Sequence, residues 1–339
     1  MNDTRQNTPD NARPASDPSH HHQGLYRGFV PQPRTQEVAD GVFATIHPDG
    51  SWGLSNAGFV HSSGTVAVVD SLLTEDRTRR FIDQIRARTG THARFVINTH
   101  HHHDHTFGNY LFPEAVVVGH EECREEVLAE GLSPADRDPF VPWGDIEVRP
   151  PEITFRDRLA VHVGNVEAQL IHVGPAHTRN DVVVWLPESR VLFAGDALFN
   201  EATPITTDGS VSGSLQALDL MRSLDPVVVV PGHGELTDVG AIDAWRGYFE
   251  FLQKAAVQAA NAGVSALEAS RGLDLGAYGE WQHPERIVLN LHRAMAENAG
   301  AHPGQKLDSR AIWADMIAFN PNAYGHKLVE GVEDYVHHD

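Results

Sequence analysis

The segment RFVINTHHHHDHTFGN, residues 94–109, holds four consecutive histidines followed by an aspartate and a fifth histidine. Imidazole nitrogens and carboxylate oxygens are the ligands that zinc and iron take from proteins. In an extended backbone the side chains alternate between two faces, so His100, His102 and Asp104 are predicted to project to one side. His105 follows where the chain must turn, and it is predicted to face a second metal ion beside the first.

The other two histidines of the run, His101 and His103, project to the opposite face in the same extended backbone. They are therefore expected to lie at the surface or behind the ligands rather than on a metal ion. A chance cluster of histidines in a polar loop is the alternative interpretation. The preceding apolar strand, the embedded aspartate and the following Gly-Asn argue against it.

Three later segments repeat one pattern, in which an apolar strand ends, glycine turns the chain and a ligand-type residue follows. They are LIHVGPAHT with His177, VLFAGDALF with Asp196, and VVVVPGHGE with His233. A carboxylate between two cations about 3.5–4 Å apart can bridge them, as hydrolytic sites with two metal ions require. The agreement of the three segments with the histidine-rich motif indicates a metal site.

The motifs THHHHDH, GPAHT, FAGD and PGHG, in this order, resemble those of metallo-β-lactamase-fold hydrolases, and specifically of glyoxalase-II-like dinuclear members. The resemblance covers about residues 40–235. It implies a four-layered αββα sandwich with the metal site at one edge, between the sheets. The implied ligands are His100, His102 and His177 for the first metal, Asp104, His105 and His233 for the second, and Asp196 as a bridge between both.

The resemblance also implies two divalent cations, zinc, with iron or manganese as alternatives. A hydroxide shared by the two ions would attack an ester, thioester, lactone or related acyl bond of a small-molecule substrate. Asp104 is expected to be catalytic as a proton shuttle, because a carboxylate bound through one oxygen leaves the other free. Many metallo-β-lactamases have a cysteine where Asp196 falls, which disfavours β-lactamase activity. The single cysteine, Cys123, lies in a helical segment and is predicted to be a core residue.

The elements that must position these residues are short strands rich in β-branched residues, with a few helices between them. Strands are predicted at 42–46, 65–70, 94–98, 115–119, 167–173, 182–186, 190–194 and 227–230, with a hairpin turn at 187–189. Helices are predicted at 74–89, capped by Thr74, and at 120–132, ended by Gly131. The fold class is therefore α+β.

Three regions follow from composition. Residues 1–35 are rich in Pro, Asn, Asp and Ser and are predicted to be a disordered arm. Residues 36–240 contain the motifs of the resemblance and are predicted to form the catalytic domain. Residues 241–339 have the apolar period of helices, and the resemblance implies that they complete the domain and the substrate pocket, with a loosely attached tail from about residue 326.

Several other residues have two open interpretations. Asp70, at the end of a strand, either orients a ligand imidazole or caps a turn. Thr178 is a candidate hydroxyl behind the ligand His177. Arg293, Lys306 and Arg310 could bind a substrate carboxylate, but they are predicted to be solvated charges.

Composition excludes several classes of function. Asp and Glu outnumber Lys and Arg by 46 to 26, giving a formal charge of -20, which repels phosphate backbones and anionic lipid. We therefore expect no nucleic-acid and no membrane partner, and no apolar run approaches the roughly 18 residues of a membrane span. The N-terminus lacks the apolar core of a secretory signal, and one cysteine allows no internal disulfide, so a cytoplasmic location is expected.

Other functions remain as alternatives. Three imidazoles with carboxylates also suit non-haem iron, and relatives of this fold include sulfur dioxygenases, so an iron oxygenase is the second candidate. Nucleic-acid hydrolysis occurs elsewhere in the fold, but it needs a basic groove, which the charge of -20 opposes. A binding protein without catalysis would be expected to lack some ligands, and none is missing here.

Overall fold

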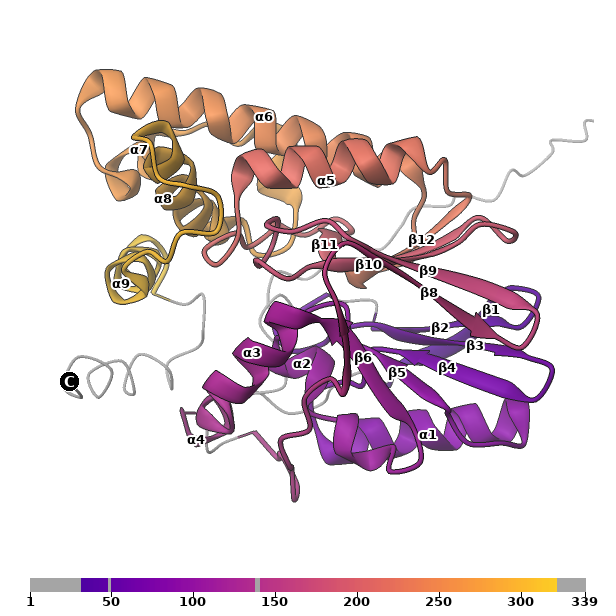
Figure 1. Ribbon diagram of the computed structural model, residues 1–339. Helices are drawn as coiled ribbons and strands as arrows, with labels where there is room; N and C mark the ends of the chain where they lie inside the picture. The colour runs from indigo at the N-terminus through magenta and orange to yellow at the C-terminus, as the bar shows by residue number, and fades with distance from the viewer. Residues whose placement is uncertain (1–31, 48–49, 138–140, 322–339) are drawn as a thin grey trace, which may run out of the picture.

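A computed structural model of the chain describes residues 32–47, 50–137 and 141–321 (Figure 1). Two β-sheets pack against each other in the middle of the molecule, and helices cover the outer face of each (Figure 1). The four-layered αββα sandwich predicted from the sequence is confirmed, and further helices near the C-terminus follow it.

The first sheet has seven strands whose order in space follows the chain. They are β1 (Arg34–Ala39), β2 (Val42–Ile46), β3 (Ala57–Ser62), β4 (Thr65–Val69), β5 (Phe95–Ile97), β6 (Val116–His120) and β7 (Ile153–Phe155). Strands β1 to β4 are antiparallel, whereas β4 to β7 are parallel. Parallel neighbours need crossover connections. Helices supply them: α1 (Glu75–Thr89), α2 (His103–Thr106) with η2 (Asn109–Leu111), and α3 (Glu121–Glu130) with α4 (Ser133–Arg137).

The second sheet has five strands in the order β12-β11-β10-β9-β8. They are β8 (Arg158–Val163), β9 (Val166–His172), β10 (Val182–Leu186), β11 (Val191–Phe199) and β12 (Val228–His233). Strands β10 and β11 are antiparallel, with Leu186 opposite Val191, so the predicted hairpin is confirmed. Strands β11 and β12 are parallel because α5 (Val211–Ser223) crosses between them.

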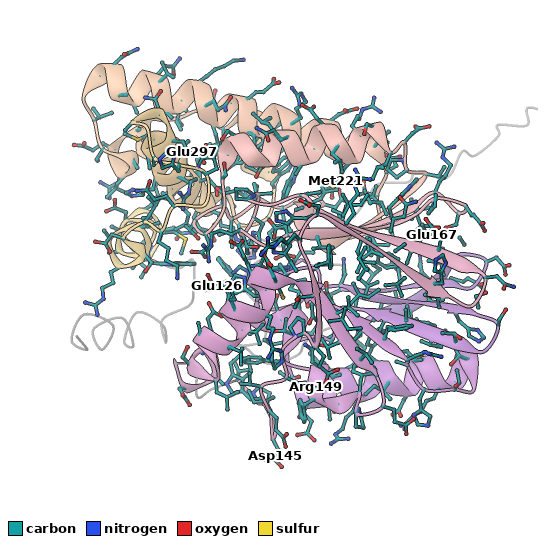
Figure 2. All side chains as sticks on the ribbon, in the orientation of Figure 1. Glu126, Asp145, Arg149, Glu167, Met221 and Glu297 are labelled. Carbon is teal, nitrogen blue, oxygen red and sulfur yellow. The ribbon has the colours of Figure 1, made fainter. Side chains whose placement is uncertain are left out.

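Alternation along the strands explains why both faces of a sheet are buried. In β10, Val182, Val184 and Leu186 face the first sheet, whereas Val183 and Trp185 face the helices. Each helix layer has its own apolar contact with a sheet; Met221 of α5, for example, belongs to the core between the second sheet and its helices (Figure 2). A strand buried on both faces reads as a continuous apolar run, which is why VVVWL was predicted from the sequence.

The chain beyond β12 is helical, as predicted. The elements are α6 (Val239–Ala262), α7 (Ala266–Gly272), η3 (Gly276–Glu280), η4 (Pro284–Arg286), α8 (Ile287–Asn298) and α9 (Ser309–Phe319). Helix α6 lies alongside α5 over the second sheet, and α7, α8 and α9 gather near one end of it (Figure 1). The prediction that Arg293 of α8 is a solvated charge is wrong, because its side chain is 0% exposed.

Local signals for the two helices of the first layer are confirmed. Thr74 caps α1 by accepting a hydrogen bond from the backbone N–H of Arg77, and α3 ends at Gly131. Strand β1 begins at Arg34, so the last two residues of the predicted arm belong to the first sheet. The rest of that arm up to residue 31, and the predicted tail, lie outside the described residues.

Candidate metal centre

The candidate ligands come from both sheets and meet at one edge of the sandwich. Residues 100–105 follow β5 of the first sheet, and His177 follows β9 of the second. Asp196 lies within β11, and His233 is the last residue of β12. The two sheets are tied together beside the site by a hydrogen bond of 2.7 Å from Val182 N to Thr99 O.

The predicted extended backbone is wrong beyond His102. That residue is the last with extended φ and ψ (−56° and 145°), and α2 begins at His103. His105 N donates to His102 O at 3.0 Å, which closes the first helical turn. Alternation had predicted that Asp104 would lie with His100 and His102. Because the chain turns, Asp104 instead groups with His105 and His233.

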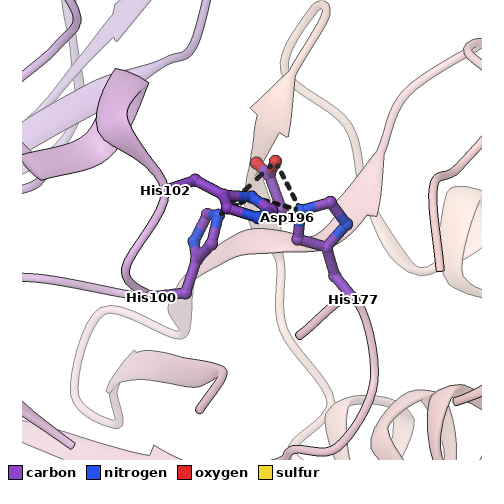
Figure 3. A group of neighbouring side chains, drawn as sticks. All are labelled: His100, His102, His177 and Asp196. Carbon is purple, nitrogen blue, oxygen red and sulfur yellow. Dashed lines mark hydrogen bonds and ion pairs between the residues drawn. The ribbon is translucent and has the colours of Figure 1, made fainter. Parts of the chain in front are cut away.

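The first group contains three histidines and Asp196, with ligand atoms all within 4.8 Å of one another (Figure 3). His102 Nδ1 lies 3.1 Å from His100 Nε2 and 2.9 Å from His177 Nε2. Asp196 Oδ2 lies 3.3 Å from His177 Nε2. Ligand atoms on a tetrahedral zinc ion, at bonds of about 2.0–2.1 Å, are about 3.3 Å apart. The two distances from His102 Nδ1 to its neighbouring imidazoles, 3.1 and 2.9 Å, are a few tenths of an ångström shorter than that value.

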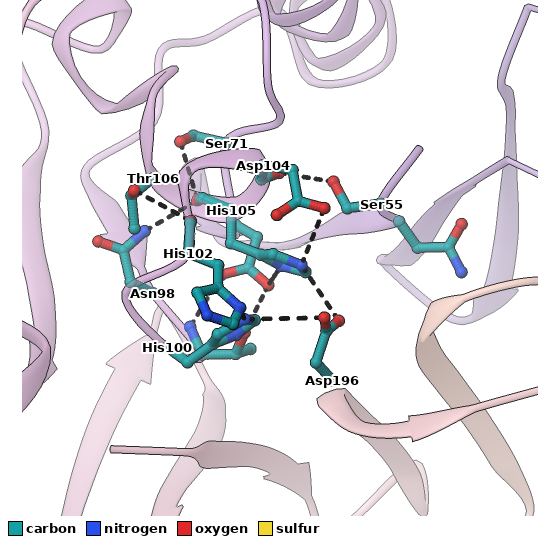
Figure 4. Close-up of polar contacts among 12 residues, drawn as sticks. Ser55, Ser71, Asn98, His100, His102, Asp104, His105, Thr106 and Asp196 are labelled. Carbon is teal, nitrogen blue, oxygen red and sulfur yellow. Dashed lines mark hydrogen bonds and ion pairs between the residues drawn. The ribbon is translucent and has the colours of Figure 1, made fainter. Parts of the chain in front are cut away.

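The second group is Asp104, His105 and His233, and Asp196 lies between the two groups. His233 Nε2 is 3.3 Å from Asp104 Oδ2 and 3.5 Å from Asp196 Oδ2. The other oxygen, Asp196 Oδ1, is 3.1 Å from His105 Nε2 (Figure 4). One carboxylate therefore offers an oxygen to each group, which is the arrangement a bridging ligand needs.

Burial and neighbouring charges shift the pKa values of His100 and His102 in the first group and of His105 in the second group in opposite directions. Burial, together with the adjacent imidazoles, lowers the pKa of His100 and of His102 well below the ordinary value, so both rings are neutral with a lone pair available. Burial also lowers the pKa of His105, but the surrounding carboxylates, Asp196 first, outweigh it and raise that pKa well above its ordinary value. Burial would raise the pKa of Asp196, yet the imidazoles, His105 first, hold it well below its usual range.

Unsatisfied polar atoms test whether these residues suit metal ions. Three buried atoms at the site make no regular hydrogen bond: His105 Nε2 and Asp196 Oδ1, which face each other as an ion pair at 3.1 Å, and His233 Nδ1. A buried polar atom without a partner costs about 1–3 kcal/mol, and ligation by a cation satisfies such an atom on a ligand face. His105 Nε2 and Asp196 Oδ1 belong to the two ligand groups, so the donor set fits divalent cations.

The sequence left the role of Asp70 open, and the structure places it behind the ligands. Asp70 Oδ2 accepts hydrogen bonds of 2.8 Å from His105 Nδ1 and from Thr99 Oγ1. Thr99 Oγ1 also lies 3.1 Å from His100 Nδ1. One carboxylate thus supports an imidazole of each group and leaves the Nε2 atoms directed at the centre.

Two supporting residues were not identified in the sequence. Asp181 accepts hydrogen bonds from the backbone N–H of Thr178 at 2.8 Å and from its hydroxyl at 2.7 Å, which fixes the turn that carries His177. Asn56 Nδ2 donates at 2.8 Å to the carbonyl oxygens of Pro231 and of Gly234, on either side of His233 at the end of β12. Neither has a sequence signal, because a lone Asp or Asn in a loop is common.

The remaining histidines of the motif lie outside both groups. His101 is 7% exposed, and its backbone N–H donates to Asn180 Oδ1 at 3.0 Å. The ring of His103 lies beside Phe107 and Trp143. Cys123 is buried, as predicted, and burial raises the pKa of its thiol well above the ordinary value, so it remains protonated.

A comparison of the amino-acid sequence with models of protein families identifies the family of the chain. The family model described as the metallo-beta-lactamase superfamily matches residues 50–233, more than half of the chain. The chain belongs to the metallo-beta-lactamase superfamily. The matched segment contains every candidate ligand described above, and it ends at His233, before the C-terminal helices.

Named relatives within this superfamily are enzymes. The chain is 33% identical over 167 residues to the hydroxyacylglutathione hydrolase of Synechococcus sp. (strain JA-3-3Ab), covering 48% of this chain and 55% of that protein. It is 28% identical over 206 residues to the 2,4-dinitroanisole O-demethylase subunit alpha of Nocardioides sp. (strain JS1661), covering 59% and 55%. The chain thus spans about half the length of these two relatives.

Among solved structures, the metallo-beta-lactamase from Pontibacter korlensis superposes with a TM-score of 0.53 at 18% identity. The superposition covers 65% of this chain and 99% of that one, which supports the shared fold. Across the described ranges, the structure contains no helix that is both long and apolar enough to span a bilayer.

Proposed function

We propose that this member of the metallo-beta-lactamase superfamily is a hydrolase with two zinc ions that cleaves an ester, thioester, lactone or related acyl bond of a small molecule. The observation that carries the proposal is the position of Asp196, which offers one oxygen to each of two buried ligand groups. The relative named hydroxyacylglutathione hydrolase supports a thioester as the bond cleaved. The single cysteine supports a reducing compartment, the cytoplasm.

The proposed ligands are His100, His102 and His177 for one ion, Asp104, His105 and His233 for the other, and Asp196 for both. Two divalent cations, when bound, supply Lewis-acid activation of a water molecule near neutral pH and of the substrate carbonyl. Asp104 is the proposed proton carrier: its Oδ2 is the atom nearest to His233, and Oδ1 is left to accept a proton and pass it to the leaving group.

The C-terminal helices are proposed to complete the substrate pocket. The loop after β2 carries Trp52, and the same loop reaches the second ligand group, where the Ser55 hydroxyl donates to the backbone oxygen of Asp104 at 2.5 Å. The ring of Trp52 lies 5.7 Å from that of Trp313 of α9, and the guanidinium carbon of Arg286 lies 4.0 Å from its centroid. These contacts support an aromatic wall beside the site, built from both parts of the chain.

The first test is elemental analysis of the purified protein, coupled to a panel of thioester, lactone and ester substrates with and without chelator. Two zinc equivalents per chain and chelator-sensitive hydrolysis are expected. Iron together with oxygen consumption would instead establish the non-haem oxygenase. Absence of any bound transition metal after reconstitution would overturn both assignments.

Substitution of His102 or Asp196 by alanine is expected to lower kcat/KM by at least about a thousandfold, because each removal opens a ligand position that holds the ions. Far-ultraviolet circular dichroism should change little. The matched control is His103→Gln, in the same histidine run but outside both ligand groups. Full activity of His102→Ala, or equal losses in His102→Ala and His103→Gln, would contradict the ligand assignment.

A further inference from the structure

Helix α8 carries a polar stripe on a buried face, which we define as Arg286, Asn290, Arg293 and Glu297. Arg286 is the N-cap of α8, and the spacings of four, three and four residues place all of them on one side of the helix. The exposed fractions of the first three are 2%, 0% and 0%. Burial of such groups is costly unless each is hydrogen-bonded, so the stripe needs partners.

The backbone partners of the stripe lie in one segment, residues 203–212, which follows β11 and runs into the first turn of α5. Asn290 Nδ2 also donates to the Tyr248 hydroxyl of α6 at 2.9 Å. Arg286 Nη1 donates to Thr203 O at 3.0 Å, and Arg293 Nε donates to Thr206 O at 3.2 Å. At the other end of the stripe, Glu297 accepts hydrogen bonds from the first backbone N–H groups of α5, near its start (Figure 2). The stripe therefore binds the backbone of this segment along its length.

Asn290 makes the densest set of these contacts. Its Nδ2 donates to Pro204 O at 2.8 Å, and its Oδ1 accepts from the backbone N–H of Thr206 at 3.1 Å and from the Thr206 hydroxyl at 3.0 Å. A donor and an acceptor of one amide thus bind the residues on either side of Ile205. The peptide of Ile205 is fixed from both sides.

The carbonyl oxygen of Ile205 accepts a hydrogen bond of 2.7 Å from His177 Nδ1. The same segment binds the backbone of the turn that carries His177, because Ser210 N donates to Ala176 O at 2.8 Å. Gly209 lies so close that a side chain there would overlap the carbonyl oxygen of Ala176. His177 is therefore oriented, at its ring and at its backbone, by a segment that α8 holds.

We propose that the polar stripe of α8 consists of positioning residues. They set the orientation of His177 and thereby the affinity of the first ligand group for its metal ion. The inference rests on the proposed function, since it takes His177 as a ligand. Helix α8 already buries Ile287, Val288, Leu289 and Leu291, so apolar packing attaches the helix without the stripe. The family match ends at His233, so α8 lies outside the matched segment.

The test measures metal affinity rather than turnover alone. Zn²⁺ affinities of the first and second equivalents are determined by competition with a chelator for the full chain and for Asn290→Asp and Asn290→Ala. The aspartate retains the acceptor for Thr206 but loses the donor to Pro204 and Tyr248, whereas alanine loses the donor and the acceptor. Because hydrogen bonds behind a ligand are worth about 10–100-fold in metal affinity, and Asn290 acts through Ile205, we expect a loss of up to about this size for one equivalent in both variants.

Two further variants provide controls. His292→Ala removes a hydrogen bond of 2.8 Å from the same helix to Asp315 of α9, and it is expected to leave Zn²⁺ affinity unchanged. Thr206→Val removes one hydrogen bond to Asn290 and serves if the Asn290 variants do not fold. The Co²⁺-loaded proteins should show an altered d–d absorption band in the Asn290 and Thr206 variants but not in His292→Ala.

The outcomes are distinguishable. A lower unfolding temperature of the Asn290 and Thr206 variants, with unchanged Zn²⁺ affinity and Co²⁺ spectrum, would make the stripe purely structural and overturn the inference. His177→Ala separates this result from a failure of the proposed function. If His177→Ala retains both metal equivalents at full affinity, the ligand assignment itself is wrong.

Discussion

Asp196 can approach two ligand groups because its neighbours are glycines. Gly195 has φ of +51°, a conformation that side chains rarely adopt. A Cβ on Gly232 would overlap Asp196 Oδ1 and the backbone of Gly195. The glycines of the FAGD and PGHG motifs therefore allow the close approach of β11 and β12 at Asp196.

Asp70 helps to orient one imidazole of each ligand group: it contacts His105 directly and His100 through the Thr99 hydroxyl. Asp70→Asn replaces one acceptor oxygen by an NH₂ group. Depending on how the amide is oriented, either the contacts from His105 and the Thr99 hydroxyl at Oδ2 or the contact from Thr99 N at Oδ1 lose their acceptor. The backbone tolerates the change, because Asp70 has φ of 60° and asparagine adopts this region readily. We expect Zn²⁺ affinity to fall about 10–100-fold, measured by chelator competition.

The matched control is Asp76→Asn, which removes an exposed carboxylate that pairs with Arg80 on α1. It changes the charge equally and should leave Zn²⁺ affinity unchanged. Equal affinity of Asp70→Asn and the unsubstituted protein would show that the contacts of Asp70 serve folding only.

At the residue scale, the sequence predicted which residues form the site better than it predicted where their side chains point. The ligand-type residues are visible as a pattern, and all seven lie together. The prediction that each follows the end of its strand is wrong for two of them, because Asp196 lies within β11 and His233 is the last residue of β12. The direction of Asp104 was mispredicted because an alternating pattern assumes an extended chain, and α2 starts one residue earlier. Asn56 and Asp181 were missed because their partners are backbone atoms, which carry no residue type.

At the scale of the elements, a stacked histidine pair joins the first sheet to the second. His120 is the last residue of β6 and the N-cap of α3, and His172 is the last residue of β9. Their ring centroids lie 4.0 Å apart with an interplanar angle of 11°. His172 also contacts the carbonyl oxygen of Arg179 through Nε2 at 3.0 Å. Burial, and then the charge of His172, lower the pKa of His120 from 6.5 to about 4.

This shift predicts a pH-dependent stability. A histidine whose pKa is lowered by folding binds more protons when unfolded, so its contribution is complete above about pH 6.5 and is lost as pH falls towards 4. A shift of this size corresponds to at most about 3 kcal/mol, and solvent screening reduces it to about 1–3 kcal/mol. His120→Asn keeps a capping side chain for α3 and removes the titrating ring.

The measurement is denaturant unfolding of both proteins, metal-loaded, from pH 7.5 to 4.5. The free energy of unfolding should fall less steeply with acidification in His120→Asn, so the difference between the proteins narrows or reverses by about 1–3 kcal/mol. His92→Asn, at an exposed position on the first layer, shows the effect of removing an exposed imidazole. Parallel curves for His120→Asn and the unsubstituted protein would exclude the stacked pair as the cause.

The elements predicted from the sequence are those whose burial makes them apolar. Strands such as β10 and β12 read as runs of valine, and α6 has an apolar period that packs on the second sheet. Strands β1, β3 and β8 were not predicted. No residue of β1 is fully buried, β8 alternates exposed with less exposed residues, and β3 has glycine, histidine and serine among its apolar residues, so none of the three is a continuous apolar run. Strand β7 has three residues, too few for any periodicity. Local sequence therefore predicts the strands that are continuous apolar runs, including β12 at an edge, and it misses the strands that are not, including β3 inside the first sheet.

At the scale of the whole molecule, metal ions would join the two halves of the sandwich. Four proposed ligands follow β5 of the first sheet, and His177, Asp196 and His233 belong to the second. Separation of the sheets during unfolding must break both ligand groups. Binding energy of the ions is then folding energy for the entire sandwich rather than for one loop.

Removal of the metals should accordingly lower the unfolding temperature of the whole chain. A ligand present at about a thousand times its Kd stabilises the folded state by about 4 kcal/mol per site. For a chain of this length, two sites correspond to a decrease of about 10 °C on chelation, reversed by Zn²⁺. Differential scanning calorimetry of loaded and chelated protein measures the shift.

The double variant His102→Ala, His105→Ala provides the decisive comparison, because it removes one proposed ligand from each group and leaves surface histidines intact. Its unfolding temperature should not respond to chelation or to added Zn²⁺. If ions bound the exposed surface instead, the variant would keep the full metal-dependent shift. If only one half of the sandwich were stabilised, the loaded protein would unfold in two separate transitions, whereas ligands shared by both sheets predict a single one.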